Sequence, residues 1–529
     1  MTALTRVHRN ADGELLPFQG TIGLEKESLR VTPEGRLAQT PHPRALGSTL
    51  THPAITTDYS EALIELITPP FADARETLGY LEDLHAFVYA HINNERLWAT
   101  SMPCVVNDDA RIPVAQYGPS HRGRMKTIYR VGLGHRYGRK MQVIAGVHFN
   151  YAPPASLFEA LARLDGHSRV ERAWRDERWM GLIRNLLRFG WIVPYLFGAS
   201  PAVCNSFVEG HGATLEPFDA VTSHLPYATS LRMGDIGYTN RIEADTGIKA
   251  CYDDLTRYTA SLRCAIETPS PRWHAIGLRD EHGEWRQLND HILQIENEYY
   301  ASVRPKQPLR GLERPVDALD ARGIAYVELR SLDVNAQHPL GIDETTLRFI
   351  ETLAFGCLLW DSPPLGSAGM REVDRNLLRV AHEGRRPDLA LERDGTEVPL
   401  RQWSRELLSA LRPIACALDR GIPGDPYRRA LAEQWGKVED PQLTPSARML
   451  EDMRARDESF FEHALRLSAQ HSNAFRHHGP LPRAAELEHL AAASLAEQAR
   501  LDATIAGRFE DFLAEYFAGR LGANDSSSH

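Results

Sequence analysis

Two acidic residues inside one strand-like stretch are the first sign of chemistry in this sequence. Glu25 and Glu27 lie in the run Gly-Leu-Glu-Lys-Glu-Ser-Leu-Arg-Val at positions 23–31, which alternates in the way a β-strand does. Their side chains therefore point to the same face of the strand. Two carboxylates on one pleated face repel each other, and they persist there at low cost only when they are solvated, protonated or neutralised by bound cations.

Three later strand-like segments also carry a carboxylate or an imidazole among apolar residues. They are residues 61–68 with Glu65, residues 141–150 with His148 and residues 324–333 with Glu328. Asp58 lies just before the first of them. Five carboxylates would be balanced roughly by two or three divalent ions. Because Mg²⁺ prefers octahedral oxygen ligation, the six side chains predict a multi-cation site that could hold a nucleoside triphosphate.

Each of these side chains also has a structural interpretation. A single histidine in a strand, such as His148, is more often a satisfied core residue than a ligand. Asp58 could cap a turn, and Glu65 could form a salt bridge with Arg30. Buried acids are rare unless they are paired or bound to metal, so the whole set favours a metal site over separate structural roles.

Arg330 follows Glu328 by two positions and would share its face of the strand. A structural ion pair between the two is one interpretation. The other, which we favour, is that the guanidinium stabilises charge that develops on a transferred phosphoryl group. Such a site suits a reaction in which ATP activates a carboxylate as an acyl phosphate before an amine attacks it.

Composition excludes several other classes of protein. The 529 residues carry a formal net charge of −10, and no lysine- or arginine-rich stripe dominates, which argues against a nucleic-acid partner. Six scattered cysteines without a C-x-x-C pair are typical of a reduced cytosolic protein. The N-terminus has no apolar signal region, and the longest apolar run, residues 189–204, is too short to span a bilayer. We expect a cytoplasmic protein with no membrane partner.

Nucleotide-binding loops of the common kinds are absent from the sequence. There is no G-x-x-x-x-G-K-[ST] motif. Gly132, Gly134 and Gly138 lack the G-x-G-x-x-G spacing, so a plain turn is the preferred interpretation. If ATP is used, a magnesium cluster held by carboxylates is one device that could bind it.

The periodicity predicts a strand-rich region, residues 1–340, followed by a mainly helical region, residues 341–529, packed on it as one unit. Further predicted strands cover residues 288–300 and the segments named above, and the predicted helices cover residues 75–95, 252–266, 344–360, 446–468 and 483–520, with another beginning near 172.

Several motifs resemble the proteobacterial type of glutamate–cysteine ligase. They are the 23–31 stretch, Thr56-Thr-Asp-Tyr-Ser-Glu-Ala-Leu-Ile-Glu65, Ser101-Met-Pro-Cys104, Gly146-Val-His-Phe-Asn150, Phe189-Gly-Trp-Ile-Val-Pro-Tyr-Leu-Phe-Gly-Ala-Ser-Pro-Ala202, Leu231-Arg through Gly237-Tyr-Thr-Asn240, Leu293-Gln-Ile-Glu-Asn-Glu298 and Val327-Glu-Leu-Arg-Ser-Leu-Asp333. The similarity is specific from about residue 20 to 345 and thinner beyond.

The resemblance implies the first step of glutathione synthesis, in which ATP, L-glutamate and L-cysteine give γ-glutamylcysteine, ADP and phosphate with Mg²⁺, or alternatively Mn²⁺. It also implies an α+β fold related to glutamine synthetase, with an antiparallel sheet curved into a bowl and helices outside. We expect a monomer. The rival classes are another carboxylate–amine ligase, such as an ammonia-using glutamine synthetase, and a non-catalytic metal- or amino-acid-binding protein.

The resemblance also implies roles for individual residues. The metal ligands would be Glu25, Glu27, Asp58, Glu65, His148 and Glu328. Arg330 would be the catalytic residue near the transferred phosphate and would contact the nucleotide, Arg232 would anchor glutamate, and the cysteine pocket would comprise Tyr129, Tyr238 and Tyr300. Packing is the alternative role of the tyrosines. Cys104 is interpreted as structural, because the mechanism needs no enzymic thiol.

Overall fold

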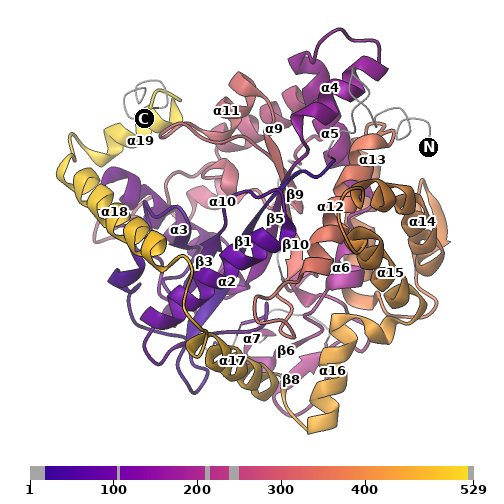
Figure 1. Cartoon of the computed structure of the whole chain (residues 1–529). Helices are drawn as coiled ribbons and strands as arrows, with labels where there is room; N and C mark the ends of the chain where they lie inside the picture. The colour runs from indigo at the N-terminus through magenta and orange to yellow at the C-terminus, as the bar shows by residue number, and fades with distance from the viewer. Residues whose placement is uncertain (1–17, 104–105, 107, 209–214, 238–248, 522–529) are drawn as a thin grey trace.

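Strands from distant parts of the chain form one antiparallel sheet at the centre of the protein (Figure 1). The structure is a computed structural model that describes residues 18–103, 106, 108–208, 215–237 and 249–521. Within these residues the sheet has seven strands: β1 (Thr21–Val31), β2 (Ile55–Thr57), β3 (Leu63–Ile67), β4 (Arg96–Leu97), β5 (Gly146–Ala152), β9 (Val303–Lys306) and β10 (Tyr326–Asp333). Their order is β2-β3-β1-β5-β10-β9, and β4 pairs with one end of β1.

One face of this sheet is apolar. Leu24 of β1 lies opposite Phe149 of β5, which lies opposite Leu329 of β10, and all three are buried. Helix α2 (Ala74–His91) packs against β1 and β3, and α12 (Glu344–Leu359) packs against β5. Because side chains alternate along each strand, the intervening residues face the other way, toward a cavity bordered by α3 (His121–Tyr137).

A β-bulge interrupts β10. Leu329 pairs with Phe149, whereas Leu332 pairs with Val147, so β10 has one residue more than β5 over this interval. A bulge bends the strand locally and changes the direction of the side chains beside it. Arg330 lies in the bulge, and its backbone N–H donates to the carbonyl oxygen of Ser302 (2.8 Å).

Helices enclose the sheet and form the outer layer (Figure 1). Before residue 340, the other helices of the described residues are α4 (Ala155–Leu164), α5 (Arg172–Arg188), α6 (Ile192–Phe197), α7 (Asn205–Val208), α9 (Leu255–Glu267), α10 (Pro271–His274) and α11 (Pro315–Arg322). Those after it are α13 (Gly366–Glu383), α14 (Leu400–Leu418), α15 (Pro426–Glu439), α16 (Pro445–Arg456), α17 (Phe460–Arg476), α18 (Ala484–Ala503) and α19 (Phe509–Phe517).

Short elements connect these layers. A small sheet contains β6 (Ala202–Cys204), β8 (Thr222–His224) and β7 (Glu216–Pro217), and a hairpin contains β11 (Ala390–Arg393) and β12 (Thr396–Pro399). The 3₁₀ turns are η1 (Arg44–Leu46), η2 (Asp109–Arg111), η3 (Met141–Val143), η4 (Leu231–Met233), η5 (Glu296–Glu298) and η6 (Pro441–Leu443).

Most predicted elements are confirmed, with shifted ends. The helices predicted at 75–95, 252–266 and 344–360 are α2, α9 and α12, and the strands predicted at 61–68 and 324–333 are β3 and β10. The strand predicted over 141–150 begins only at Gly146, after η3. The helix predicted at 446–468 is two helices, separated at Asp457, whose φ of 54° is left-handed. Residues 483–520 likewise divide into α18 and α19.

The strand predicted over residues 288–300 is wrong. Its acids hydrogen-bond to nearby backbone N–H groups instead of lining a strand: Glu298 accepts from Gln294 N (2.7 Å), and Glu296 accepts from Val316 N (3.3 Å). The local bond between Glu298 and Gln294 offers the backbone an alternative to a sheet ladder. The segment therefore forms bends and the turn η5.

The turn predicted at Gly132 and Gly134 is also wrong, because both glycines lie inside α3. A Cβ at Gly132 would overlap the Gln294 side chain, and one at Gly134 would overlap the Tyr59 hydroxyl. The two glycines thus allow the side chains of Gln294 and Tyr59 to pack closely against α3. Gly138, with φ of 81°, follows the last residue of the helix.

The five cysteines of the described residues are free thiols, as expected of a reduced protein, and Cys104 lies outside those residues. A search of the described helices for one both long and apolar enough to cross a membrane finds none.

Candidate active site

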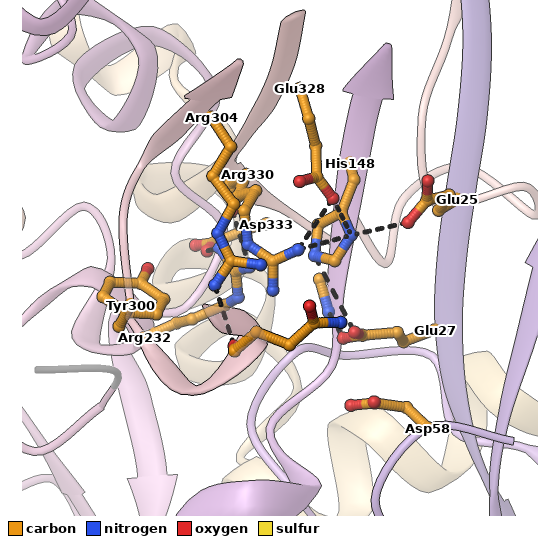
Figure 2. A network of polar contacts seen from close by, with 12 residues as sticks. Glu25, Glu27, Asp58, His148, Arg232, Tyr300, Arg304, Glu328, Arg330 and Asp333 are labelled. Atoms are coloured by element: carbon orange, nitrogen blue, oxygen red, sulfur yellow. Dashed lines mark hydrogen bonds and ion pairs between the residues drawn. The ribbon is translucent and has the colours of Figure 1, made fainter. Parts of the chain in front are cut away.

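Polar side chains cross the sheet in a row on the face opposite the apolar core. Glu27 of β1 lies opposite Glu65 of β3, and Glu25 of β1 lies opposite His148 of β5. Directly opposed residues share a face of the sheet. Glu328 of β10 pairs with Asn150 of β5 and extends the row. Glu25, Glu27, His148 and Glu328 thus lie on one surface (Figure 2), and the pairing of Glu65 with Glu27 places Glu65 on it too.

His148 lies at the centre of the row. Its Nδ1 atom is 3.2 Å from Glu25 Oε2 and 3.5 Å from Glu328 Oε1, and its Nε2 atom is 3.8 Å from Glu27 Oε1. Asp58 follows β2 and lines the same cavity, with Arg130 Nη2 at 3.8 Å from its Oδ1. The structure therefore brings all six proposed ligands together.

A subset of these residues has the geometry of a metal site. One ligand atom each of Glu25, Glu65 and His148 lie within 4.8 Å of one another. Carboxylate oxygen suits Mg²⁺ and Mn²⁺, and imidazole suits the latter better. The donor set therefore fits a divalent cation.

Protein cations neutralise one end of the row. Arg330 Nη1 lies 2.8 Å from Glu328 Oε1, and Lys306 Nζ of β9 lies 3.4 Å from Glu328 Oε2. The ion pair considered for Arg330 and Glu328 is thus present, on the cavity face and beside the other acids. Arg330 can therefore both pair with Glu328 and be positioned to contact a phosphate group in the cavity.

The pKa values of the carboxylates divide in the same way. Burial and the charge of Glu328 act to raise the pKa of Glu25, but the hydrogen bond with His148 and the charge of Lys306 outweigh them and hold it at about 2. For Glu328, burial acts upward, yet Lys306 and Arg330 hold the pKa well below its usual value. Both groups are ionised at neutral pH.

At the other end of the row the compensation is weaker, because Arg232 and Arg330 act on the acids there only from beyond ion-pair distance. Burial raises the pKa of Glu65 well above its usual value, and neighbouring carboxylates, Glu25 first, raise it further. Burial also raises the pKa of Glu27, although the charge of His148 opposes the shift. Within the described part of the chain neither acid forms an ion pair with a lysine or arginine. A bound cation would supply the missing positive charge.

The salt bridge considered between Glu65 and Arg30 is wrong. Glu65 lies opposite Glu27, whereas Arg30 is three positions further along β1 and points to the other face. There Arg30 pairs with Glu95, with Nη1 2.6 Å from Oε2. The alternation of the strand separates the two residues.

The cavity above the row has a volume of about 470 Å³. Tyr129 and Lys126 of α3 line it, with Tyr300 from the segment before β9 and Tyr516 of α19. This is within the range for small-molecule sites. Two of the three proposed cysteine-pocket tyrosines thus lie at the cavity, and Tyr238 is outside the described residues.

Arg232 does not line the cavity but lies immediately beside it. Its guanidinium is buried, and Nη2 donates to the carbonyl oxygen of Arg330 (2.8 Å). Figure 2 shows it beside Tyr300. The resemblance placed this arginine at the glutamate site, and its position next to the carboxylate row is compatible with that role.

Three residues at the site were missed by sequence analysis: Arg304, Lys306 and Asp333. In β9, Val303-Arg304-Pro305-Lys306, charged residues alternate with buried ones, which is a recognisable signal. Asp333 ends the motif at residues 327–333, but sequence analysis assigned it no role. Its burial could not be read from the sequence alone.

Comparison with known proteins agrees with this geometry. The family model for glutamate–cysteine ligase matches residues 4–380. Glutamate–cysteine ligase of Pseudomonas paraeruginosa is 50% identical over 502 residues, and that of Azotobacter vinelandii is 50% identical over 505 residues, with 94% of each chain covered in both cases.

Solved structures agree as well. A crystal structure of glutamate–cysteine ligase from Francisella tularensis in complex with AMP matches with a TM-score of 0.88 and 36% identity, over 95% of this chain and 98% of that one. The match confirms the fold class that the resemblance implies. A bifunctional glutathione synthetase from Pasteurella multocida matches with a TM-score of 0.69 and 25% identity, over 90% of this chain and 54% of that one. Similarity over nearly the whole chain, in sequence and in structure, shows that this protein belongs to the glutamate–cysteine ligase family.

Proposed function

We propose that the protein joins the γ-carboxylate of L-glutamate to the amine of L-cysteine at the expense of ATP, giving γ-glutamylcysteine, ADP and phosphate. The observation that carries the proposal is the row of acids and cations, assembled from five strands and the Asp58 loop beside a cavity of substrate size. Family membership supplies the identity of the substrates.

Each residue of the row has a proposed role. Glu25, Glu27, Asp58, Glu65, His148 and Glu328 would hold Mg²⁺, or alternatively Mn²⁺. When bound, such ions would neutralise the triphosphate and polarise the transferred phosphoryl group. Arg330 and Lys306 already lie beside Glu328. They would stabilise the negative charge that spreads over the oxygens of the transferred phosphoryl group.

The substrates would lie on either side of the transferred group. Arg232 would hold the α-carboxylate of glutamate and so orient the γ-carboxylate. Tyr129, Tyr238 and Tyr300 would form the pocket of cysteine. Tyr129 of α3 and Tyr300 both line the cavity, and Tyr238 lies outside the described residues.

The reaction would proceed in two steps. An oxygen of the glutamate γ-carboxylate attacks the γ-phosphorus of ATP, the bond to the bridging oxygen breaks, and ADP leaves. The cysteine nitrogen then attacks the carbonyl carbon of the acyl phosphate. The tetrahedral intermediate loses a proton from nitrogen and expels inorganic phosphate, which leaves the amide. Proximity and charge neutralisation supply most of the rate.

Phosphate release with each substrate omitted in turn tests the proposal. Full release requires ATP, glutamate and cysteine together, and mass spectrometry identifies γ-glutamylcysteine. Release with ammonium in place of cysteine would assign a glutamine synthetase activity instead. If no phosphate is released under any condition, the ligase assignment is refuted and a non-catalytic binding protein is the remaining interpretation.

We also propose a monomeric, cytoplasmic enzyme in which residues 341–529 pack on residues 1–340 as one unit. One support for the last point is that a single cluster of buried apolar residues includes members of both regions, among them Phe18, Ile22, Phe355 and Leu487. The elution volume in size-exclusion chromatography tests whether the protein is a monomer. A single unfolding transition would support the packing of the two regions as one unit.

A further inference from the structure

Asp333, the last residue of β10, is a buried carboxylate that the proposed chemistry does not use. Its side chain has 0% of its surface exposed. It accepts hydrogen bonds from Ser200 Oγ (2.6 Å), Ala199 N (2.8 Å) and Ser230 Oγ (2.9 Å). Arg232 Nη1 lies 3.7 Å from its Oδ1. Buried acids are rare without such partners, so this arrangement calls for an explanation.

The bulge in β10 places Asp333 on the polar face of the sheet. Glu328 pairs with Asn150, and Asp333 pairs with Gly146. The two acids are an odd number of positions apart and would lie on opposite faces of a regular strand. Because the bulge adds one residue between them, both face the same side.

Gly146 makes room for Arg232 on that side. A Cβ at Gly146 would overlap the guanidinium of Arg232, so the arginine lies directly over this glycine. The backbone N–H of Gly146 also donates to Glu27 Oε2 (2.7 Å). Arg232 therefore lies between Asp333, 3.7 Å from its Nη1, and the glycine whose N–H binds Glu27.

The partners of Asp333 hold the backbone of Arg232 too. Ser230, which donates to Asp333, accepts from Met233 N (3.2 Å) and so caps the turn η4 that contains Arg232. Ser200, the other hydroxyl donor, accepts from Arg232 N (3.5 Å). One carboxylate thus connects to both the side chain and the main chain of the arginine.

We propose that Asp333 is a positioning residue, which holds Arg232 in the orientation that binds the α-carboxylate of glutamate. The inference rests on the proposed function. Asp333 supplies compensating negative charge at 3.7 Å, while its oxygens are hydrogen-bonded to neutral donors. The pair is therefore not a bidentate clamp. Ser200 connects the two residues, because its hydroxyl donates to Asp333 and accepts from the backbone N–H of Arg232.

Asp333→Asn tests this role, because it removes the charge and keeps the size and most of the hydrogen-bonding capacity. We expect the KM for glutamate to rise about 10- to 100-fold, since a displacement near 1 Å can change rates by about 10²-fold. The KM values for ATP and cysteine should stay within about twofold, because a loss of binding confined to one substrate moves only that constant.

A double-mutant cycle separates positioning from general damage. In an Arg232→Lys background, Asp333→Asn should change the KM for glutamate by less than about twofold, because the two residues act on the substrate as one unit. Ser230→Ala is a milder test, should Asp333→Asn fail to fold. It removes one of the three hydrogen bonds and should raise the same KM about threefold.

Asp419→Asn is the matched control. Asp419 is also buried and accepts from Tyr427 N (2.8 Å), but it joins α14 to α15 away from the cavity. It should lower stability and leave all three KM values unchanged. The inference is overturned if Asp333→Asn raises the three KM values alike, or if its effect persists in full beside Arg232→Lys. Absence of γ-glutamylcysteine from the unmodified protein would instead refute the proposed function.

Discussion

Replacing Glu65 by glutamine should stabilise the metal-free protein and weaken its affinity for metal. Glu65 lies across from Glu27, and its ligand atom is within 4.8 Å of one on Glu25. Its raised pKa reflects burial first and these neighbouring charges second. Glutamine keeps the shape of the side chain and removes the charge. A purely structural carboxylate would give the opposite sign in the metal-free state.

The separation sets the size of the first effect. Two unit charges 4.8 Å apart in an effective dielectric of about 20 repel by about 3 kcal/mol. Proton uptake by Glu65 relieves part of this, so we expect a gain of about 1–3 kcal/mol in metal-free stability at pH 8. For 529 residues the unfolding entropy is about 1 kcal/mol per kelvin, so the melting temperature should rise by about 1–3 °C.

The second effect appears when Mg²⁺ is added. Loss even of a residue that supports a metal ligand costs about 10- to 100-fold in affinity, and loss of a ligand should cost at least that. Bound metal at about 100 times its dissociation constant stabilises a protein by about 2.7 kcal/mol. Saturating Mg²⁺ should therefore raise the melting temperature of the unmodified protein by more than that of Glu65→Gln.

Calorimetric melting in EDTA and in Mg²⁺ measures both effects, with Glu61→Gln as the control. Glu61 is buried and lies four positions before the half-buried Glu65, but its carboxylate accepts from the backbone N–H groups of His42 and Gln116, both at 2.8 Å. Its replacement should lower the melting temperature equally in both conditions. A Glu65→Gln protein that is less stable in EDTA and responds to Mg²⁺ like the unmodified protein would refute the reasoning.

Four further changes have defined outcomes. Arg330→Lys should lower kcat by about 10²- to 10³-fold, as the loss of an oxyanion donor does, and a near-normal kcat in the phosphate-release assay would exclude its role. Glu27→Gln should raise the Mg²⁺ concentration required for activity and leave the circular dichroism spectrum intact, so an unchanged metal titration would count against ligation. Gly146→Ala should raise the KM for glutamate about tenfold or more, because the new methyl group displaces Arg232, and an unchanged KM would contradict the packing. Burial raises the pKa of Glu351 from 4.5 to about 7, so the folded protein holds a proton that the unfolded chain releases, and stability falls as pH rises through this window. Glu351→Gln should remove that fall, of about 3 kcal/mol at most, and melting curves from pH 5 to 8 that keep the original slope would show the interpretation to be wrong.

Much of the carboxylate row could be predicted from the sequence, because it follows from alternation. Glu25 and Glu27 occupy one face of β1, and an acid inside an apolar strand is conspicuous wherever it occurs. What the sequence could not show is the pairing of strands. Only the register establishes that Glu65 lies opposite Glu27, and therefore that Glu65 is on the face of the sheet from which Arg30 points away.

The failures have separate physical causes, and in each of them a local or tertiary contact overrides the sequence pattern. Glu296 and Glu298 alternate like strand residues but hydrogen-bond to nearby backbone. The glycines of α3 resemble a turn but allow close approach of Gln294 and Tyr59. The role of Asp333 depends on a bulge and on two distant serines, and neither has a sequence signal.

At the bulge, β10 could lose one residue and still keep its register with β5 on both sides. Arg330 and Ser331 together occupy the place opposite His148. If Ser331 were removed, Asn150 would keep Glu328 as its neighbour and Gly146 would keep Asp333. The side chain of Arg330 would be re-aimed, together with the carbonyl group that accepts from Arg232 Nη2. A single-codon deletion here would therefore change the surroundings of Arg330 and keep the strand pairing on either side of it.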